Sequence, residues 1–168
     1  MNLKTIRKQQ YARRNGGIFI DIHNWRKSPY TFLKGRFLME SSSLVVYLLQ
    51  DTKITANLLT IVFALLGIFG GLLLLINPVL AVIIFFFKPI FDWSDGHLAM
   101  IKNQTSEFGK HLDFYSGSIG TMSFYIGVVL GHTYLIPVIF IIYLLGKLDG
   151  RARTIDLLCL LILLKECL

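Results

Sequence analysis

Three aspartates lie in one short stretch, residues 91–117, which reads FDWSDGHLAMIKNQTSEFGKHLDFYSG. Asp92 and Asp95 are three residues apart, so on a helix their side chains share a face. Asp113 follows Gly109 by four residues, which gives this pair a shared face of the next helix. The stretch joins two long apolar segments, so we expect the two helices to be neighbours and the three carboxylates to converge.

Three carboxylates this close repel one another, and a carboxylate removed from water is costly to ionise. A divalent cation offsets both effects, and a ligand set made only of oxygen favours Mg²⁺ or Mn²⁺. The small residues beside the carboxylates, Gly96, Ala99 and Gly109, leave room for a nucleotide or for close helix packing. The pattern therefore predicts a metal and phosphate site in which the three aspartates are the metal ligands.

Each aspartate taken alone has a simpler explanation. Asp92 can pair with Lys88, one helical turn earlier. Asp95 can pair with His97 or Lys110, and any of these carboxylates can be solvated at a helix end. The joint spacing on two adjacent helices, with glycines beside it, favours a site over this structural explanation.

Composition places the stretch at the edge of a membrane. The chain of 168 residues is 54% hydrophobic and only 16% charged, below the roughly 25% of soluble domains. Residues 54–87 and 114–146 contain no Asp, Glu, Lys or Arg, and each is too long for one span of about 20 residues. Each has a helix breaker near its middle, at Asn77-Pro78 and at Gly131. We therefore predict an all-α integral membrane protein, a bundle of at least four transmembrane helices.

Basic residues set the expected orientation. Residues 1–53 carry ten Lys or Arg against three acids, and the two predicted hairpin turns carry no Lys or Arg. By the positive-inside rule the N-terminus and the carboxylate stretch face the cytoplasm. We predict a basic N-terminal segment over residues 1–53 and a transmembrane domain over residues 54–168. The net charge of +7 then reflects topology and anionic headgroups, and no nucleic-acid partner is expected.

The segment Phe37–Gln50, after an aromatic and basic stretch, suits a helix that lies on the cytoplasmic membrane interface. A poorly ordered tail is the alternative. Ile155–Leu168 is apolar but only 14 residues long, so it suits an interfacial helix or the start of a fifth span.

The carboxylate spacing resembles that of the CDP-alcohol phosphotransferase (CDP-alcohol phosphatidyltransferase) family, the membrane enzymes of phospholipid head-group synthesis. The family pattern is D-x2-D-G-x2-A-R-x8-G-x3-D-x3-D, and six of its eight fixed positions match here with every interval kept. Met100 replaces the arginine, and Gly117 replaces the last aspartate. The stretch Ala56–Thr60 (ANLLT) is similar to the family's Pro-Asn-x-x-Thr. The resemblance covers about residues 54–146.

The resemblance implies a mechanism and its partners. In the family, the aspartates hold two divalent ions on the diphosphate of a CDP-linked lipid donor, often CDP-diacylglycerol. An acceptor alcohol attacks the phosphorus next to the lipid alcohol, and CMP leaves. Carried over, the three aspartates here hold Mg²⁺ or Mn²⁺, and Gly96, Ala99 and Gly109 lie against the CDP diphosphate. Family relatives often form dimers through later spans, so the resemblance leaves a homodimer open here, and it leaves the acceptor alcohol open as well.

The last aspartate of the family pattern is taken to be the general base, and Gly117 cannot serve as one. His111 is the first substitute to consider, although its spacing places it roughly on the opposite side of the helix from the nearest aspartate. Tyr115, Ser116 and His97 are weaker alternatives.

Other functions compete with the phosphotransferase. A relative that binds a nucleotide-lipid or a partner protein without turnover is the main alternative, and Met100, Gly117 and the short C-terminus favour it. An intramembrane prenyltransferase fits less well, because its first motif needs an aspartate where Ala99 stands. A small transporter needs carboxylates near the middle of the membrane, whereas these lie at helix ends.

Overall fold

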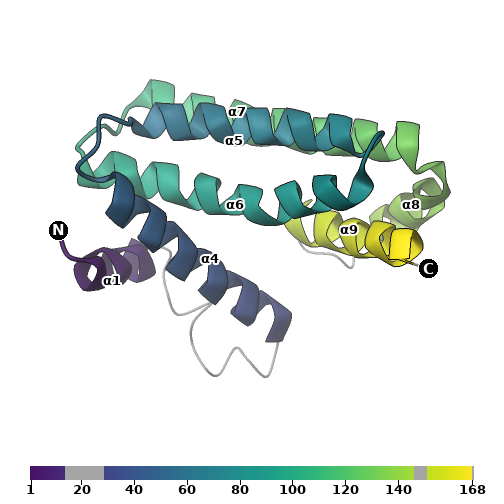
Figure 1. Cartoon of the computed structure of the whole chain (residues 1–168), viewed down its shortest axis with the longest axis horizontal. Coiled ribbons are helices and arrows are strands. Elements are labelled where there is room, and N and C mark those ends of the chain that lie inside the picture. Colours follow the sequence, from purple (N-terminus) through teal and green to yellow (C-terminus); the bar gives the residue numbers. More distant parts are fainter. Residues whose placement is uncertain (14–28, 146–150, 168) are drawn as a thin grey trace. The chain divides into compact units, whose positions relative to one another are not determined.

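A computed structural model of the chain describes residues 1–13, 29–145 and 151–167. Within these ranges the chain forms helices and no strand (Figure 1), which confirms the predicted all-α class. The elements, in chain order, are α1 (Leu3–Arg13), α4 (Pro29–Leu49), α5 (Ala56–Leu73), α6 (Pro78–Ile101), α7 (Glu107–Gly131), the 3₁₀ helix η1 (Thr133–Leu135), α8 (Ile136–Leu145) and α9 (Arg151–Cys167).

The chain divides into two compact units. The first unit consists of Met1–Thr60 and Pro89–Asp113, and the second of Ile61–Lys88 and Phe114–Leu168. All three aspartates of the carboxylate stretch belong to the first unit, so that unit positions the candidate site. The predicted functional division at residue 53 stays a prediction.

Polar side chains fix where three of the helices begin. The residue before each of α5, α6 and α7 caps the helix, because its side-chain oxygen accepts a hydrogen bond from a backbone N–H in the first turn. Thr55 accepts from the N–H of Leu58 at 3.3 Å, Asn77 from that of Leu80 at 3.1 Å, and Ser106 from that of Gly109 at 3.0 Å. Pro78 occupies the first position of α6, where a missing N–H costs nothing. The predicted break at Asn77-Pro78 is confirmed.

The loop between α6 and α7 is a tight helix ending. Asn103 adopts a positive φ of 53°, the left-handed conformation that ends many helices and that asparagine tolerates. The N–H of Gln104 then donates to the carbonyl of Ala99 at 2.8 Å, which satisfies one carbonyl of the last turn. This short connection returns the chain so that the end of α6 and the start of α7 lie in the same unit.

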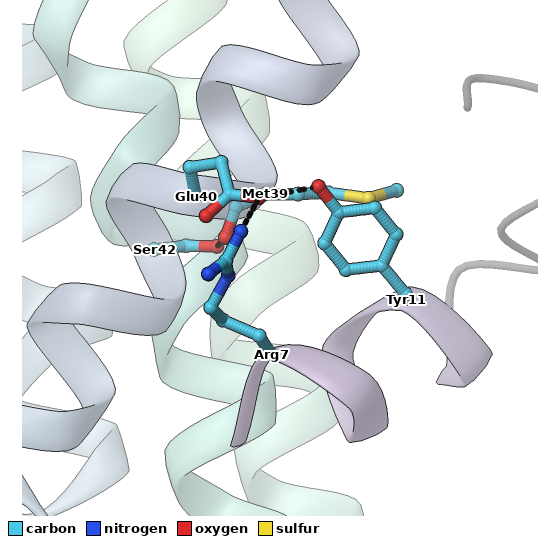
Figure 2. Close-up of polar contacts among 5 residues, drawn as sticks. All are labelled: Arg7, Tyr11, Met39, Glu40 and Ser42. Atoms are coloured by element: carbon cyan, nitrogen blue, oxygen red, sulfur yellow. Dashed lines mark hydrogen bonds and ion pairs between the residues drawn. The ribbon is translucent and has the colours of Figure 1, made fainter. Parts of the chain in front are cut away.

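In the first unit, α1 is clamped to α4 through one carboxylate (Figure 2). Glu40 of α4 accepts hydrogen bonds from Arg7 (2.7 Å) and from the hydroxyl of Tyr11 (2.5 Å). Burial alone would raise the pKa of the Glu40 carboxyl, but the hydrogen bonds from Tyr11 and Arg7 outweigh burial and lower this pKa. The predicted helix over Phe37–Gln50 is present as part of α4. Its place on the membrane interface stays a prediction.

The second unit contains the larger apolar core. Its buried members come from the turn after α5 and from α6, α7, η1 and α9: Leu74, Ala81, Val82, Phe85, Phe124, Val128, Leu135, Leu158, Cys159 and Ile162. α7 ends at Gly131, as predicted, and the buried ring of His132 then bonds the carbonyl of Leu74 through Nε2 at 3.1 Å. The helix α9 contains most of the apolar C-terminal segment and packs into this core.

Length and hydropathy identify fewer membrane spans than the sequence analysis predicts. Among the described residues, α5 passes as a single span with a mean hydropathy of 2.2. α7 and Thr133–Ile141 pass together, but they are bent by 110° at their junction. α6 carries Lys88, Asp92 and Asp95, which is much charge for a span of its length. The four-span bundle and the cytoplasmic N-terminus therefore stay predictions.

Close helix packing in the second unit depends on Gly67 of α5. A Cβ atom at this position would lie 2.6 Å from the Cα of Gly120 on α7. It would also lie 2.9 Å from Cε of Lys88, whose ammonium group sits over the ring of Phe63 at 3.6 Å from the centroid. Lys88 can adjust, but the backbone of Gly120 cannot move without separating the helices.

Gly67→Ala is expected to lower the free energy of unfolding by about 1–3 kcal/mol, the usual cost of overpacking, even though alanine favours a helix by about 1 kcal/mol over glycine. Gly117→Ala is the matched control, because among the described residues a Cβ there would meet only Cε1 of Phe63, at 4.0 Å. Thermal unfolding in detergent should show a loss for the first variant and no loss for the second. Equal midpoints for the two variants would contradict this packing.

Candidate functional site

A cavity of about 250 Å³ opens in the first unit, between the start of α5, the end of α6 and the start of α7. Its lining is rich in oxygen and nitrogen atoms and in small residues. The lining consists of Ala56, Asn57, Thr60, Asp95, Gly96, Ala99, Met100, Gln104, Thr105, Ser106, Gly109, Lys110 and Asp113. Five of the residues proposed from the sequence are therefore brought together: Asp95, Gly96, Ala99, Gly109 and Asp113.

Asp95 is the most constrained side chain of the cavity. Its side chain is buried, with 4% of the residue exposed. The hydroxyl of Thr60, which is also buried, donates to Oδ2 of Asp95 at 2.6 Å, and the backbone N–H of Gly96 donates to Oδ1. Because one donor bonds each oxygen of the Asp95 side chain, the two donors hold it in one orientation.

The other two aspartates differ in their placement. Asp113, on α7, is exposed and lines the cavity beside Asp95. Asp92 is half-buried and is not part of the lining, although its charge and that of Asp113 both act on Asp95. The structure thus brings together two of the three predicted ligands around one cavity.

His111, the substitute base suggested by the sequence, is exposed on α7 and does not line this cavity. Met100, which stands where the family pattern has arginine, does line it and is 52% exposed. Gly117 lies one helical turn after Asp113 on α7, and a Cβ atom at this position would meet Cε1 of Phe63 at an ordinary van der Waals distance of 4.0 Å.

The donor set of the cavity suits a hard divalent cation in part. Two carboxylates and the oxygens of Thr60 and Asn57 face one space, and Mg²⁺ typically takes one or two protein carboxylates and completes its shell with phosphates and water. In the described ranges no three His, Cys, Asp or Glu residues are arranged to hold a metal ion by themselves. The residues therefore fit a cation that shares its coordination with a phosphate ligand.

The loop after α6 fixes the other wall of the cavity. Gln104 accepts a hydrogen bond from the backbone N–H of Ala56 at 3.3 Å. The ammonium group of Lys102 donates to the carbonyls of Thr52 and Ile54, both at 2.7 Å. These bonds tie the α6–α7 loop to the start of α5, and so they hold Asn57 in the wall of the cavity.

Gly109 allows α7 to approach this wall. A Cβ atom at Gly109 would lie 3.2 Å from Oδ1 of Asn57 and 3.2 Å from Oγ of Ser106. That spacing is tighter than ordinary van der Waals contact, so any larger residue would displace a polar wall of the cavity. The sequence analysis assigned Gly109 to the site, whereas Thr60 and Asn57 entered it only through the resemblance of Ala56–Thr60.

Comparison with known families decides the class of the chain. The model of the CDP-alcohol phosphatidyltransferase family matches residues 53–161, which is more than half of the sequence and includes the whole lining of the cavity. The chain belongs to this family. No curated protein and no solved structure matches it. The resemblance drawn from the carboxylate spacing is therefore confirmed at the level of the family.

The family is a membrane-associated class of enzymes that transfer a phosphatidyl group from a CDP-alcohol in phospholipid synthesis. The matched range begins after α4, so α1 and α4 lie outside it. The matched range contains the parts of α5, α6 and α7 that line the cavity.

Thr60→Val is expected to destabilise the protein by about 2 kcal/mol, because it leaves the buried side chain of Asp95 without one of its hydrogen bonds. Valine has nearly the same shape, so packing changes little. Thr60→Ser keeps the hydroxyl and is the matched control. Thermal unfolding in detergent should rank the natural chain close to Thr60→Ser and well above Thr60→Val. A Thr60→Val protein as stable as Thr60→Ser would show that the bond to Asp95 contributes nothing.

Proposed function

We propose that the protein moves a phosphatidyl group from a CDP-linked lipid donor, in particular CDP-diacylglycerol, to an alcohol acceptor and releases CMP. The observation that carries the proposal is the cavity in which Asp95 and Asp113 face one space beside Gly96 and Gly109. Two carboxylates next to small residues suit a diphosphate whose charge is shared with Mg²⁺ or Mn²⁺. The family match supports the reaction class.

Each residue of the cavity has a part in the proposed reaction. A bound divalent cation would neutralise the donor diphosphate and stabilise the charge that develops as CMP leaves. Asp95 holds one side of that site in the orientation set by Thr60. Asp113 faces it from α7, and Gly96 and Gly109 keep the space between the helices open for the diphosphate.

The acceptor alcohol must lose its proton during the transfer. Gly117 offers no base, and we retain His111 as the proposed substitute because it is an imidazole two residues before Asp113 on α7, although it lies outside the cavity lining. A general base typically contributes about 10² to 10⁴-fold, so a chain without one would be slow rather than inert.

We also propose a multi-pass arrangement with the N-terminus and the cavity on the cytoplasmic side. The ten basic residues of the first 53 positions support this orientation. Asp92 acts in the proposal as an additional charge beside Asp95, and as a ligand once the donor is bound. Homodimer formation is a further part of the proposal.

A relative that binds the donor without turnover is the second candidate. Gly117 favours it, because this position lacks both a ligand and a base. Met100 favours it as well, because a neutral side chain lines the cavity where the family pattern places a positive charge. The two candidates share the donor site and differ only in whether CMP is released.

The experiment that tests the proposed function is Mg²⁺- or Mn²⁺-dependent release of CMP from CDP-diacylglycerol in detergent, with a panel of acceptor alcohols. The natural chain is expected to release CMP, and Asp113→Asn is expected to lose at least tenfold. Gly117→Asp is expected to be faster, because a Cβ atom fits at this position without a close contact and the carboxylate would stand one turn from Asp113. If only Gly117→Asp releases CMP, the natural chain is the non-catalytic relative. Silence from both would contradict the family reaction in this chain.

A further inference from the structure

The side chain of Gln10 connects three helices of the first unit. Gln10 lies on α1 and is fully buried, with 0% of the residue exposed. Its amide nitrogen donates to Oγ of Ser42 on α4 at 2.9 Å and to the backbone carbonyl of Trp93 on α6 at 3.1 Å. Trp93 stands between Asp92 and Asp95, so a residue 83 positions away in sequence holds the turn that carries both aspartates.

The same turn is bonded to α4 from the other side. Ser94 donates to the carbonyl of Ile90 within α6 at 2.6 Å and reaches the carbonyl of Ser42 at 3.5 Å. Ser42 itself donates to the carbonyl of Met39 at 3.2 Å. Ser42 is thus approached by Gln10 through its hydroxyl and by Ser94 through its carbonyl, which makes a continuous polar contact among α1, α4 and α6.

Two rows of side chains hold α1 in the position that this contact needs. Ile6 lies one turn before Gln10 and is buried in a cluster with Val46, Leu59 and Leu98. Arg7 and Tyr11, also one turn apart, bond Glu40 (Figure 2). Because residues four apart share a helix face, α1 presents a buried row and a clamping row side by side. Gln10 belongs to the buried row.

A glutamine is a costly choice for this position. Its Oε1 atom is buried and has no hydrogen-bond partner in the part of the chain that the structure describes. A buried amide oxygen without a partner costs roughly 1–3 kcal/mol, and an apolar residue would extend the row that begins with Ile6. The two bonds made by Nε2 are what distinguish glutamine from such a residue.

We propose that Gln10 is a positioning residue for the proposed phosphotransferase site, on whose function this inference rests. Its amide fixes the carbonyl of Trp93 and thereby the placement of Asp92 and Asp95. α1 lies outside the range matched by the family model, so this brace belongs to the N-terminal segment rather than to the family core. Gln10 acts through the backbone of α6 and touches neither the donor nor the acceptor.

The test compares Gln10→Met with Ile6→Val in the full chain. Methionine has a similar length and volume but cannot donate a hydrogen bond, whereas Ile6→Val loosens α1 by packing alone, at about 0.5–1.5 kcal/mol. The first measurement is Mn²⁺ affinity by electron paramagnetic resonance in the presence of CDP. Gln10→Met is expected to bind Mn²⁺ about tenfold more weakly, as is usual when a residue that orients metal ligands is lost. The Mn²⁺ affinity of Ile6→Val is expected to stay within about twofold of that of the natural chain. Equal affinity for Gln10→Met and the natural chain, or an equal loss in Ile6→Val, would overturn the proposal.

A second measurement separates this inference from the proposed function. Amide hydrogen exchange of peptides covering residues 90–101, without metal, should be fastest in Gln10→Met, because Ile6→Val only trims a packing contact with Leu98 in this segment. Exchange in Ile6→Val as fast as in Gln10→Met would overturn the proposal. If exchange is the same in all three proteins, Gln10 does not position the turn, whatever the metal result. If the natural chain binds no Mn²⁺, the proposed function fails, and the exchange comparison alone then decides whether Gln10 holds the turn.

Discussion

The side chain of Asp95 is buried from water. Several contacts of the first unit hold it in position. A buried carboxylate must be hydrogen-bonded or compensated to remain charged. Thr60 and the N–H of Gly96 supply the hydrogen bonds. The compensation we propose is a divalent cation shared with a diphosphate. Without such a ligand, Asp95 and Asp113 would face each other across the cavity at an electrostatic cost.

The need to hold Asp95 in position explains why several hydrogen bonds lie at the start of α5. Thr60 can reach Asp95 only if α5 begins at the right place, and the cap by Thr55 sets that start. Gln104 and Lys102 then tie the loop after α6 to the same segment. On the other side, the brace through Gln10 fixes α6 where Asp95 leaves it. In the proposed function, activity would therefore depend on residues that touch no substrate.

Local chemistry made part of this predictable from the sequence. Asn77-Pro78 and Gly131 end or begin helices for reasons contained in the residues themselves, namely capping and conformational freedom. The carboxylate interval identified Asp95 and Asp113, because i, i+3 and i, i+4 spacing is a property of any helix. Gly109 followed for the same reason.

The remainder depends on contacts between distant parts of the chain. The bond from Gln10 to Trp93 spans 83 positions and leaves no periodic signal. The position of Thr60 in an apolar helix gives no sign of its partner, because Asp95 comes from α6. The sequence predicts four membrane spans, whereas length and hydropathy identify one helix among the described residues, or two spans if the bent pair counts as one. α6 does not qualify, because it combines apolar residues with Lys88, Asp92 and Asp95.

The central claim is that the Asp95 cavity binds a diphosphate together with a divalent cation. It is tested most directly by equilibrium binding of CDP-diacylglycerol to the detergent-solubilised chain, with and without Mn²⁺, beside the variant Asp95→Asn. We expect tight binding of CDP-diacylglycerol to require Mn²⁺. We expect Asp95→Asn to lose at least about tenfold in affinity for this lipid, as is usual when the surroundings of a metal site are altered. Binding that is equally tight without Mn²⁺, or unchanged in Asp95→Asn, would contradict the claim.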